Sequence, residues 1–176
     1  MENIQDNRRR EIFDWIESVA VAVTCVILAM VFIAKVYTVR ETSMYPTLEN
    51  GSKLIALNIY RDVRPGDIII FEDPELKESL IKRVIAVGGD EIDIDMSGNV
   101  YVNGEISEFV ASGEWNLRGN LSYPLTVPEG QLFVMGDNRS VSLDSRDSRV
   151  GFVYEREVCA VARFTIYPFS KFGKVS

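Results

Sequence analysis

The hydrophobic residues of this chain are unevenly distributed, with one long apolar stretch near the N-terminus. Residues 18–34 contain no charged side chain, and Glu17 and Lys35 bound them. In a helix this stretch extends roughly 25 Å, and its apolar flanks bring the length to about that of a bilayer core. Because the stretch is apolar on every helical face, a buried globular helix is disfavoured. The pattern therefore predicts a transmembrane helix over residues 15–37.

A cleaved signal peptide is the main alternative for this stretch. Such peptides have a shorter apolar core, typically about 7–15 residues, followed by small residues at a cleavage site. Here the exit sequence FIAKVYTV offers no clean Ala-x-Ala. The run Arg8–Arg10 favours a cytoplasmic N-terminus, although Lys35 and Arg40 beyond the span reduce this bias. We expect a cytoplasmic tail over residues 1–14 and a domain over residues 38–176 on the outer face of the cytoplasmic membrane.

After the apolar stretch, short β-branched runs alternate with turns rich in glycine, proline, asparagine and aspartate. Two of these runs, 91–95 and 100–104, form a predicted hairpin. No pattern of a long amphipathic helix follows the span, so we predict a mostly β domain. The polar segment 105–124 is expected to be a variable excursion from this domain. The runs typical of strands are 53–59, 67–73, 79–87, 91–95, 100–104, 125–127, 131–136 and 158–168.

The composition narrows the possible chemistry. A formal net charge of −7 argues against a nucleic-acid binder held by phosphate contacts. The chain has no histidine, which excludes Ser-His-Asp and Cys-His arrangements and removes the commonest zinc ligand. Cys25 and Cys159 lack the spacing of a metal cluster and are interpreted as small core residues. A hydrolase with this sequence needs another base, and we expect no metal and no cofactor.

The first candidate for chemistry is Ser43, in the segment Thr42–Leu48 that Asn50 and Gly51 follow. One interpretation is structural, with Ser43 capping a single helical turn that ends at the Asn-Gly pair. The other is nucleophilic, and the two are compatible because backbone N–H groups near such a turn can face an oxyanion. Ser43 lies eight residues after Lys35, within roughly 29 Å of the end of the span even in an extended chain.

The second candidate is Lys82, which follows apolar residues and precedes Arg83. In a strand these two cations point to opposite faces, so one of them must lie against apolar surface. Both could instead extend to solvent from an edge strand. If Lys82 is buried, desolvation lowers the pKa of its amine and makes a neutral base available near pH 7. Arg83 cannot serve in this way because it stays protonated.

The third candidate is the segment 136–149, which follows the apolar run 131–135 and carries hydroxyls, carboxylates and guanidinium groups. It is either a solvated surface loop or an internally bonded loop that orients a lysine and a serine. A metal site formed by Asp137, Asp144 and Asp147 is a weaker alternative, because three neighbouring arginines compete for their oxygens.

Together these three segments resemble the bacterial type I signal peptidases, a family of Ser-Lys peptidases. The stretch Ser43–Leu48 resembles the family's nucleophile motif, and Lys82-Arg83 followed by 88–90 (Gly-Gly-Asp) resembles its base motif. The segment 136–146 is similar to its Gly-Asp-Asn-Arg…Ser-x-Asp-Ser-Arg signature. The resemblance implies a single transmembrane helix followed by an antiparallel β catalytic domain of the signal-peptidase/LexA-like kind.

By this resemblance, Ser43 is the nucleophile and Lys82 the general base. Ser142 would orient the Lys82 amine, and Asp144 and Arg146 would hold the loop through an ion pair. The substrates would be secretory preproteins with signal peptides, cleaved after small residues at positions −3 and −1 by a monomer bound to the lipid bilayer. Shallow apolar pockets suit that specificity, and the residues expected to line them are Val39, Met44, Leu48 and Ile81.

One position departs from the family pattern. Some members have a serine or glycine two residues before the nucleophile, where a hydroxyl can supply a second oxyanion donor. This chain has Glu41 there, and an ionised carboxylate cannot donate a hydrogen bond. The resemblance therefore gives the backbone N–H of Ser43 as one oxyanion donor and leaves the second donor open.

Two rival functions predict different features. A self-cleaving repressor would use the same Ser-Lys chemistry but would carry a helix-turn-helix domain, whose pattern is absent from the sequence. A catalytically inactive, membrane-tethered β domain that binds extracytoplasmic partners would tolerate replacement of Ser43 or Lys82.

Overall fold

The computed structural model describes residues 2–58, 62–74, 78–109 and 118–175, which form two compact units, Met1–Lys35 and Val36–Ser176. The first unit consists mainly of helix α1, Glu2–Ile33. Within it, Arg10–Ile33 is long and apolar enough to cross a membrane. The helix starts earlier than the predicted span over 15–37, so most of the expected tail 1–14 is helical. It also ends earlier, because Ala34–Thr38 form strand β1, in which valine, tyrosine and threonine favour extended backbone.

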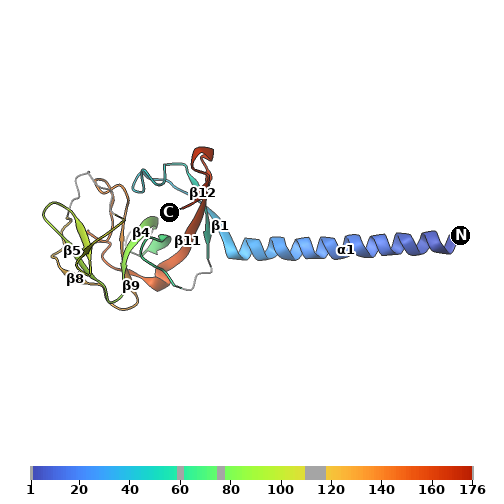
Figure 1. Cartoon of the computed structure of the whole chain (residues 1–176), viewed down its shortest axis with the longest axis horizontal. Coiled ribbons are helices and arrows are strands. Elements are labelled where there is room, and N and C mark those ends of the chain that lie inside the picture. Colours follow the sequence, from blue (N-terminus) through green and yellow to red (C-terminus); the bar gives the residue numbers. More distant parts are fainter. Residues whose placement is uncertain (1, 59–61, 75–77, 110–117, 176) are drawn as a thin grey trace. The chain divides into compact units, whose positions relative to one another are not determined.

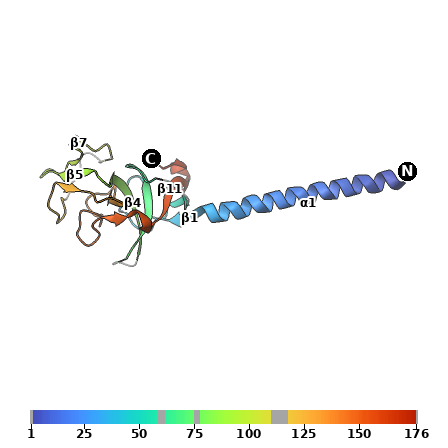
Figure 2. The ribbon, with the colours of Figure 1, turned by 90° about the horizontal axis from the view of Figure 1, so that it is seen from below.

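The second unit is built from two antiparallel sheets (Figure 1). The larger has the order β1-β2-β11-β3-β4-β9-β10, with β12 pairing β11, and the smaller has the order β7-β6-β5-β8. Figures 1 and 2 show the smaller sheet, marked by β5, on one side of this unit and β11 on the other. The strands after β1 are β2 Lys53–Leu57, β3 Ile68–Asp73, β4 Glu78–Val87, β5 Glu91–Ile94, β6 Val100–Val102, β7 Glu105–Ile106, β8 Leu125–Thr126, β9 Gln131–Met135, β10 Val153–Tyr154, β11 Val158–Tyr167 and β12 Gly173–Lys174. Two short 3-10 helices, Glu155–Glu157 and Phe169–Lys171, flank β11.

The mostly β prediction is confirmed, since each of the eight predicted runs contains a strand. The predicted hairpin is β5–β6, in which Ile92 is opposite Val102 and Ile94 is opposite Val100. The strands that were not predicted, apart from β1, are only two residues long, too short for a periodic pattern. Part of the expected excursion over 105–124 lies outside the described residues, and its described part includes β7 and Phe109, which packs on the core.

Strand β4 occupies the interior of the larger sheet, between β3 and β9. Leu80 and Val84 belong to one hydrophobic cluster, while Ile81 packs against another on the opposite face. Because both faces of β4 are covered, the adjacent cations Lys82 and Arg83 are both buried, with exposed fractions of 1% and 6%. The edge-strand alternative, in which both extend to solvent, is therefore excluded.

Candidate active site

Ser43 lies in a tight turn between β1 and β2. Leu48 donates its backbone N–H to the Met44 carbonyl at 2.8 Å, which closes one helical turn. The side chains of Met44 and Leu48 are buried in the core and hold this turn against the sheet. Ser43 is itself buried. The chain therefore presents the serine from a rigid turn rather than from a solvated loop.

The Lys82 side chain reaches this turn from the middle of β4. Its Nζ donates a hydrogen bond to Ser43 Oγ at 3.0 Å, although the residues are 39 positions apart in sequence. Burial lowers the pKa of Lys82, while the carboxylates of Asp144 and Glu41 act in the opposite direction. A neutral Lys82 amine at this distance is within reach to take the serine proton. The arrangement has the geometry of a nucleophile and its general base.

The loop that follows β9 encloses the serine turn. Asn138 donates its backbone N–H to the Ser43 carbonyl at 2.9 Å, and its side-chain amide donates to the Thr42 carbonyl at 3.1 Å. Gly136 passes so close that a Cβ at this position would lie 2.5 Å from the Ser43 carbonyl oxygen and 2.6 Å from Ser142 Cβ. The φ angle of Gly136 is not in the left-handed region, so backbone conformation does not require glycine here. Glycine is required because there is no space for a Cβ.

Ser142 therefore lies beside the serine turn, as the resemblance implied. Its hydroxyl is buried and makes no hydrogen bond to Lys82 in the part of the chain that the structure describes. The predicted hydrogen bond from Ser142 to the Lys82 amine is thus not seen. The Ser142 hydroxyl does lie near Asp144, where it helps to lower the pKa of that carboxyl.

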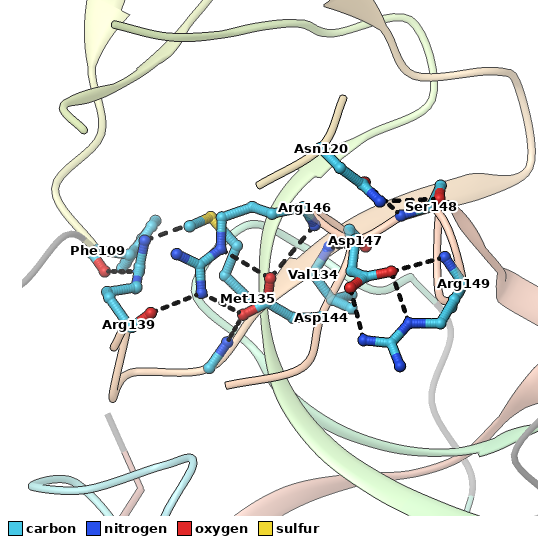
Figure 3. Close-up of polar contacts among 12 residues, drawn as sticks. Phe109, Asn120, Val134, Met135, Arg139, Asp144, Arg146, Asp147, Ser148 and Arg149 are labelled. Carbon is cyan, nitrogen blue, oxygen red and sulfur yellow. Dashed lines mark hydrogen bonds and ion pairs between the residues drawn. The ribbon is translucent and has the colours of Figure 1, made fainter. Parts of the chain in front are cut away.

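Asp144 and Arg146 form the ion pair that the resemblance implied (Figure 3). Arg146 contacts both carboxylate oxygens, with Nε–Oδ1 at 2.8 Å and Nη2–Oδ2 at 2.9 Å. Asp144 Oδ2 also accepts the backbone N–H of Gly136 at 3.0 Å. Burial opposes ionisation of Asp144, but the hydrogen bonds and charge of Arg146 prevail and lower its pKa. The pair fixes the loop at the point where it passes Ser43.

A second buried ion pair was not predicted. Arg83 contacts Asp137 through Nε–Oδ1 and Nη2–Oδ2, both at 2.8 Å, and donates Nη1 to the Gly66 carbonyl at 2.9 Å. The signal in the sequence was that one of the adjacent cations Lys82 and Arg83 must lie against apolar surface. A buried arginine needs a carboxylate partner. The Asp137 carboxylate was instead considered for a metal site, together with Asp144 and Asp147. Each of the three carboxylates is paired with an arginine.

A cleft of about 660 Å³ opens at the serine turn. Of the residues expected to line a substrate pocket, Val39, Met44 and Ile81 line this cleft. Leu48 does not line it and lies in the same hydrophobic cluster as Val39 and Met44. The remaining walls include residues that the sequence did not single out, namely Tyr37, Arg40, Ile70, Glu78 and Leu80.

Glu41 also lines the cleft, beside Ser43, and its side chain is exposed. Its carboxylate raises the pKa of Lys82, so its charge reaches the amine. The backbone N–H of Ser43 donates no hydrogen bond within the described part of the chain, which leaves it available to an oxyanion. The second oxyanion donor is not identified by this geometry.

A buried serine–lysine pair at a cleft of an antiparallel β domain is an arrangement that suits a serine peptidase with lysine in place of histidine. The family model described as "Signal peptidase, peptidase S26" matches residues 12–167. The chain is 33% identical over 180 aligned residues to signal peptidase I of Bacillus licheniformis, covering 96% of this chain and 95% of that protein. It is 31% identical to signal peptidase IB of Staphylococcus aureus (strain COL), covering 93% and 94%. The chain belongs to the signal peptidase family, peptidase S26, as its motifs predicted.

Proposed function

We propose that this protein is a membrane-bound endopeptidase that removes N-terminal signal peptides from secreted preproteins, with Ser43 as nucleophile and Lys82 as general base. The observation that carries the proposal is the buried hydrogen bond of 3.0 Å between Lys82 Nζ and Ser43 Oγ. Family membership supports the same reaction.

In the first half of the reaction, neutral Lys82 takes the proton of Ser43 as Oγ attacks the scissile carbonyl. The negative charge that forms on the carbonyl oxygen is stabilised by the Ser43 N–H. Protonated Lys82 then gives its proton to the leaving amine, and the C–N bond breaks to leave an acyl-enzyme on Ser43.

In the second half, Lys82 takes a proton from water, which attacks the ester carbonyl of the acyl-enzyme. The ester bond breaks, the proton returns to Ser43, and the signal peptide leaves with a new carboxyl end. The ion pair Asp144–Arg146 holds the loop that encloses the Ser43 turn. It would therefore keep Ser43 within reach of Lys82 through both halves of the reaction.

The proposed specificity is for small residues at positions −3 and −1, which would lie in the cleft at Ser43. The walls of the cleft near Ser43 include the buried side chains of Val39 and Met44. Small apolar side chains would fit against these walls, and larger ones would overpack them.

The proposed topology follows from the helix and from the position of Ser43. Helix α1 crosses the cytoplasmic membrane once, with the arginines at 8–10 on the cytoplasmic side. The unit Val36–Ser176 then lies on the outer face, where a monomer meets preproteins as they leave the bilayer. Ser43 stays near the membrane surface because few residues separate it from the end of α1.

The test is cleavage of a preprotein with an Ala-x-Ala site by detergent-solubilised protein. We expect cleavage by wild type, no cleavage by Ser43→Ala and Lys82→Met, and normal cleavage by Lys53→Met. Lys53 is the matched control because it is an exposed strand lysine. Equal cleavage by Lys82→Met and wild type would contradict the assignment of Lys82, and cleavage by Ser43→Ala would contradict that of Ser43.

A further inference from the structure

Asn138 joins the loop after β9 to the serine turn through its side chain as well as its backbone. Its backbone N–H donates to the Ser43 carbonyl, and its side-chain amide donates from Nδ2 to the Thr42 carbonyl at 3.1 Å. Asn138 is half-buried, so its amide is not needed to fill the core. The proposed reaction does not use this side chain.

The amide of Asn138 contacts the peptide group that carries the proposed oxyanion donor. The Thr42 carbonyl and the Ser43 N–H belong to one planar trans peptide group, so they point in opposite directions. A donor that fixes the direction of the Thr42 carbonyl therefore fixes the direction of the Ser43 N–H as well. This N–H donates no hydrogen bond within the described part of the chain, so it is available to an oxyanion.

The Thr42 carbonyl accepts a second hydrogen bond, from the backbone N–H of Tyr45 at 3.1 Å. That bond lies within the serine turn and moves with it. Asn138 belongs instead to a loop that the buried pair Asp144–Arg146 holds in place. A carbonyl oxygen has two lone pairs, and these two donors use both. The peptide group is thus fixed from within the turn and from the loop outside it.

The amide of Asn138 is oriented by Ser140, whose hydroxyl donates to Asn138 Oδ1 at 2.9 Å. The Thr42 carbonyl can only accept a hydrogen bond, so the amide nitrogen must face it and the amide oxygen must face Ser140. The loop also turns back on Asn138, because the backbone N–H of Ser142 donates to the Asn138 carbonyl at 3.1 Å. These contacts hold the donor at the serine turn.

We propose that Asn138 is a positioning residue for the oxyanion hole, which holds the Thr42–Ser43 peptide group so that the Ser43 N–H faces the developing oxyanion. This inference rests on the proposed function. A hydrogen bond to the carbonyl oxygen strengthens as charge develops on it, so its alignment affects the transition state more than the bound substrate. Donation to the Thr42 carbonyl also polarises the peptide group and makes its N–H a better donor.

The experiment compares Asn138→Ala and Asn138→Asp in steady-state cleavage of a preprotein with an Ala-x-Ala site by detergent-solubilised protein. Alanine removes the whole amide, including its contact with Ser140. Aspartate keeps the shape and can still accept from Ser140, but it places a second acceptor against the Thr42 carbonyl. Loss of an entire oxyanion donor costs roughly 100–1,000-fold in kcat. We therefore expect kcat to fall about 10-fold in Asn138→Ala and about 100-fold in Asn138→Asp, with KM within about twofold.

These kcat values are taken from the plateau above the acid limb, because a new carboxylate can also raise the pKa of Lys82 and reduce activity at lower pH. Asn120→Asp is the matched control. Asn120 is an exposed asparagine that also ties a distant segment to this loop, with Nδ2 donating to Ser148 Oγ at 3.1 Å (Figure 3). In the described ranges its side chain hydrogen-bonds to Ser148 alone, so Asn120→Asp should keep the wild-type kcat.

Ser140→Ala gives a second result that leaves Asn138 in place. It removes only the exposed hydroxyl that orients the amide, so kcat should fall about 2–10-fold, which corresponds to one hydrogen bond, with KM unchanged. If Asn138 served only to tether the loop, Asn138→Asp would retain more activity than Asn138→Ala because it keeps the shape of asparagine.

That reversed order would overturn the role of Asn138, as would a wild-type kcat in Ser140→Ala or a loss that lies in KM instead of kcat. With wild-type cleavage intact, these results would leave the proposed function untouched. An absence of cleavage by wild type would overturn the proposed function and this role together.

Discussion

Replacing Gly136 by alanine should disable the site while leaving the protein folded. The added Cβ would lie 2.5 Å from the Ser43 carbonyl oxygen and closer still to Ser142 Oγ, whereas ordinary contacts of Cβ atoms begin near 3.4 Å. The serine turn and the loop must therefore separate by about 1 Å, because close-packed neighbours cannot absorb the difference. Such overpacking costs about 1–3 kcal/mol of stability.

A shift of this size matters more for the reaction than for folding. A displacement of about 1 Å can reduce the rate roughly 100-fold, because the serine and the lysine no longer meet the scissile carbonyl together. We therefore expect kcat/KM for preprotein cleavage to fall about 100-fold in Gly136→Ala, measured well below its Tm.

Gly104→Ala is the control for this experiment. Gly104 has a φ of +80° and nothing within 4 Å of an added Cβ, in the turn between β6 and β7. Alanine there should cost about 1–2 kcal/mol through backbone strain, with no displacement of the site. The two variants should lose similar stability, so a difference in kcat/KM between them reports the displacement of the site. A kcat/KM for Gly136→Ala within a few-fold of that for Gly104→Ala would refute the reasoning.

Two further predictions concern the charges of the site. Glu41→Gln removes a carboxylate that raises the pKa of Lys82, so the acid limb of kcat/KM should move to lower pH, and an unchanged limb would contradict this coupling. Asp137→Asn removes the carboxylate that pairs with the buried Arg83 guanidinium, and loss of this buried pair should cost about 3–5 kcal/mol in urea unfolding. Asp147→Asn breaks an exposed pair and should leave the free energy of unfolding almost unchanged, and equal losses in the two variants would contradict the role of burial.

The strands and the serine turn could be predicted from sequence because their signals are local. β-branched runs between turn residues located the strands from β2 to β11 that are longer than two residues. At residues 34–37 the same signals were masked by the apolar stretch, and strand β1 was taken for the end of the helix. Hydropathy alone does not distinguish the last turn of a helix from an apolar strand.

The site could be predicted only in part, because its contacts join distant residues. Strand parity placed one of the two β4 cations against apolar surface, but it could not show that both faces of β4 are covered. The pair Arg83–Asp137 joins residues 54 positions apart, which no local pattern contains. The resemblance located Ser142 beside the site but gave it a hydrogen bond to Lys82 that the structure lacks. Leu48 is apolar like the residues that line the cleft, yet it packs in the hydrophobic cluster and does not line the cleft.

The central claim, that buried Lys82 is the base for Ser43, is tested most directly by the pH dependence of kcat/KM for preprotein cleavage. The acid limb of this profile reports the pKa of the free enzyme's base. Burial lowers the pKa of Lys82, so activity should rise with pH through a midpoint below the ordinary lysine value of 10.5. An activity that does not fall at low pH, or a midpoint at the ordinary value, would contradict the account.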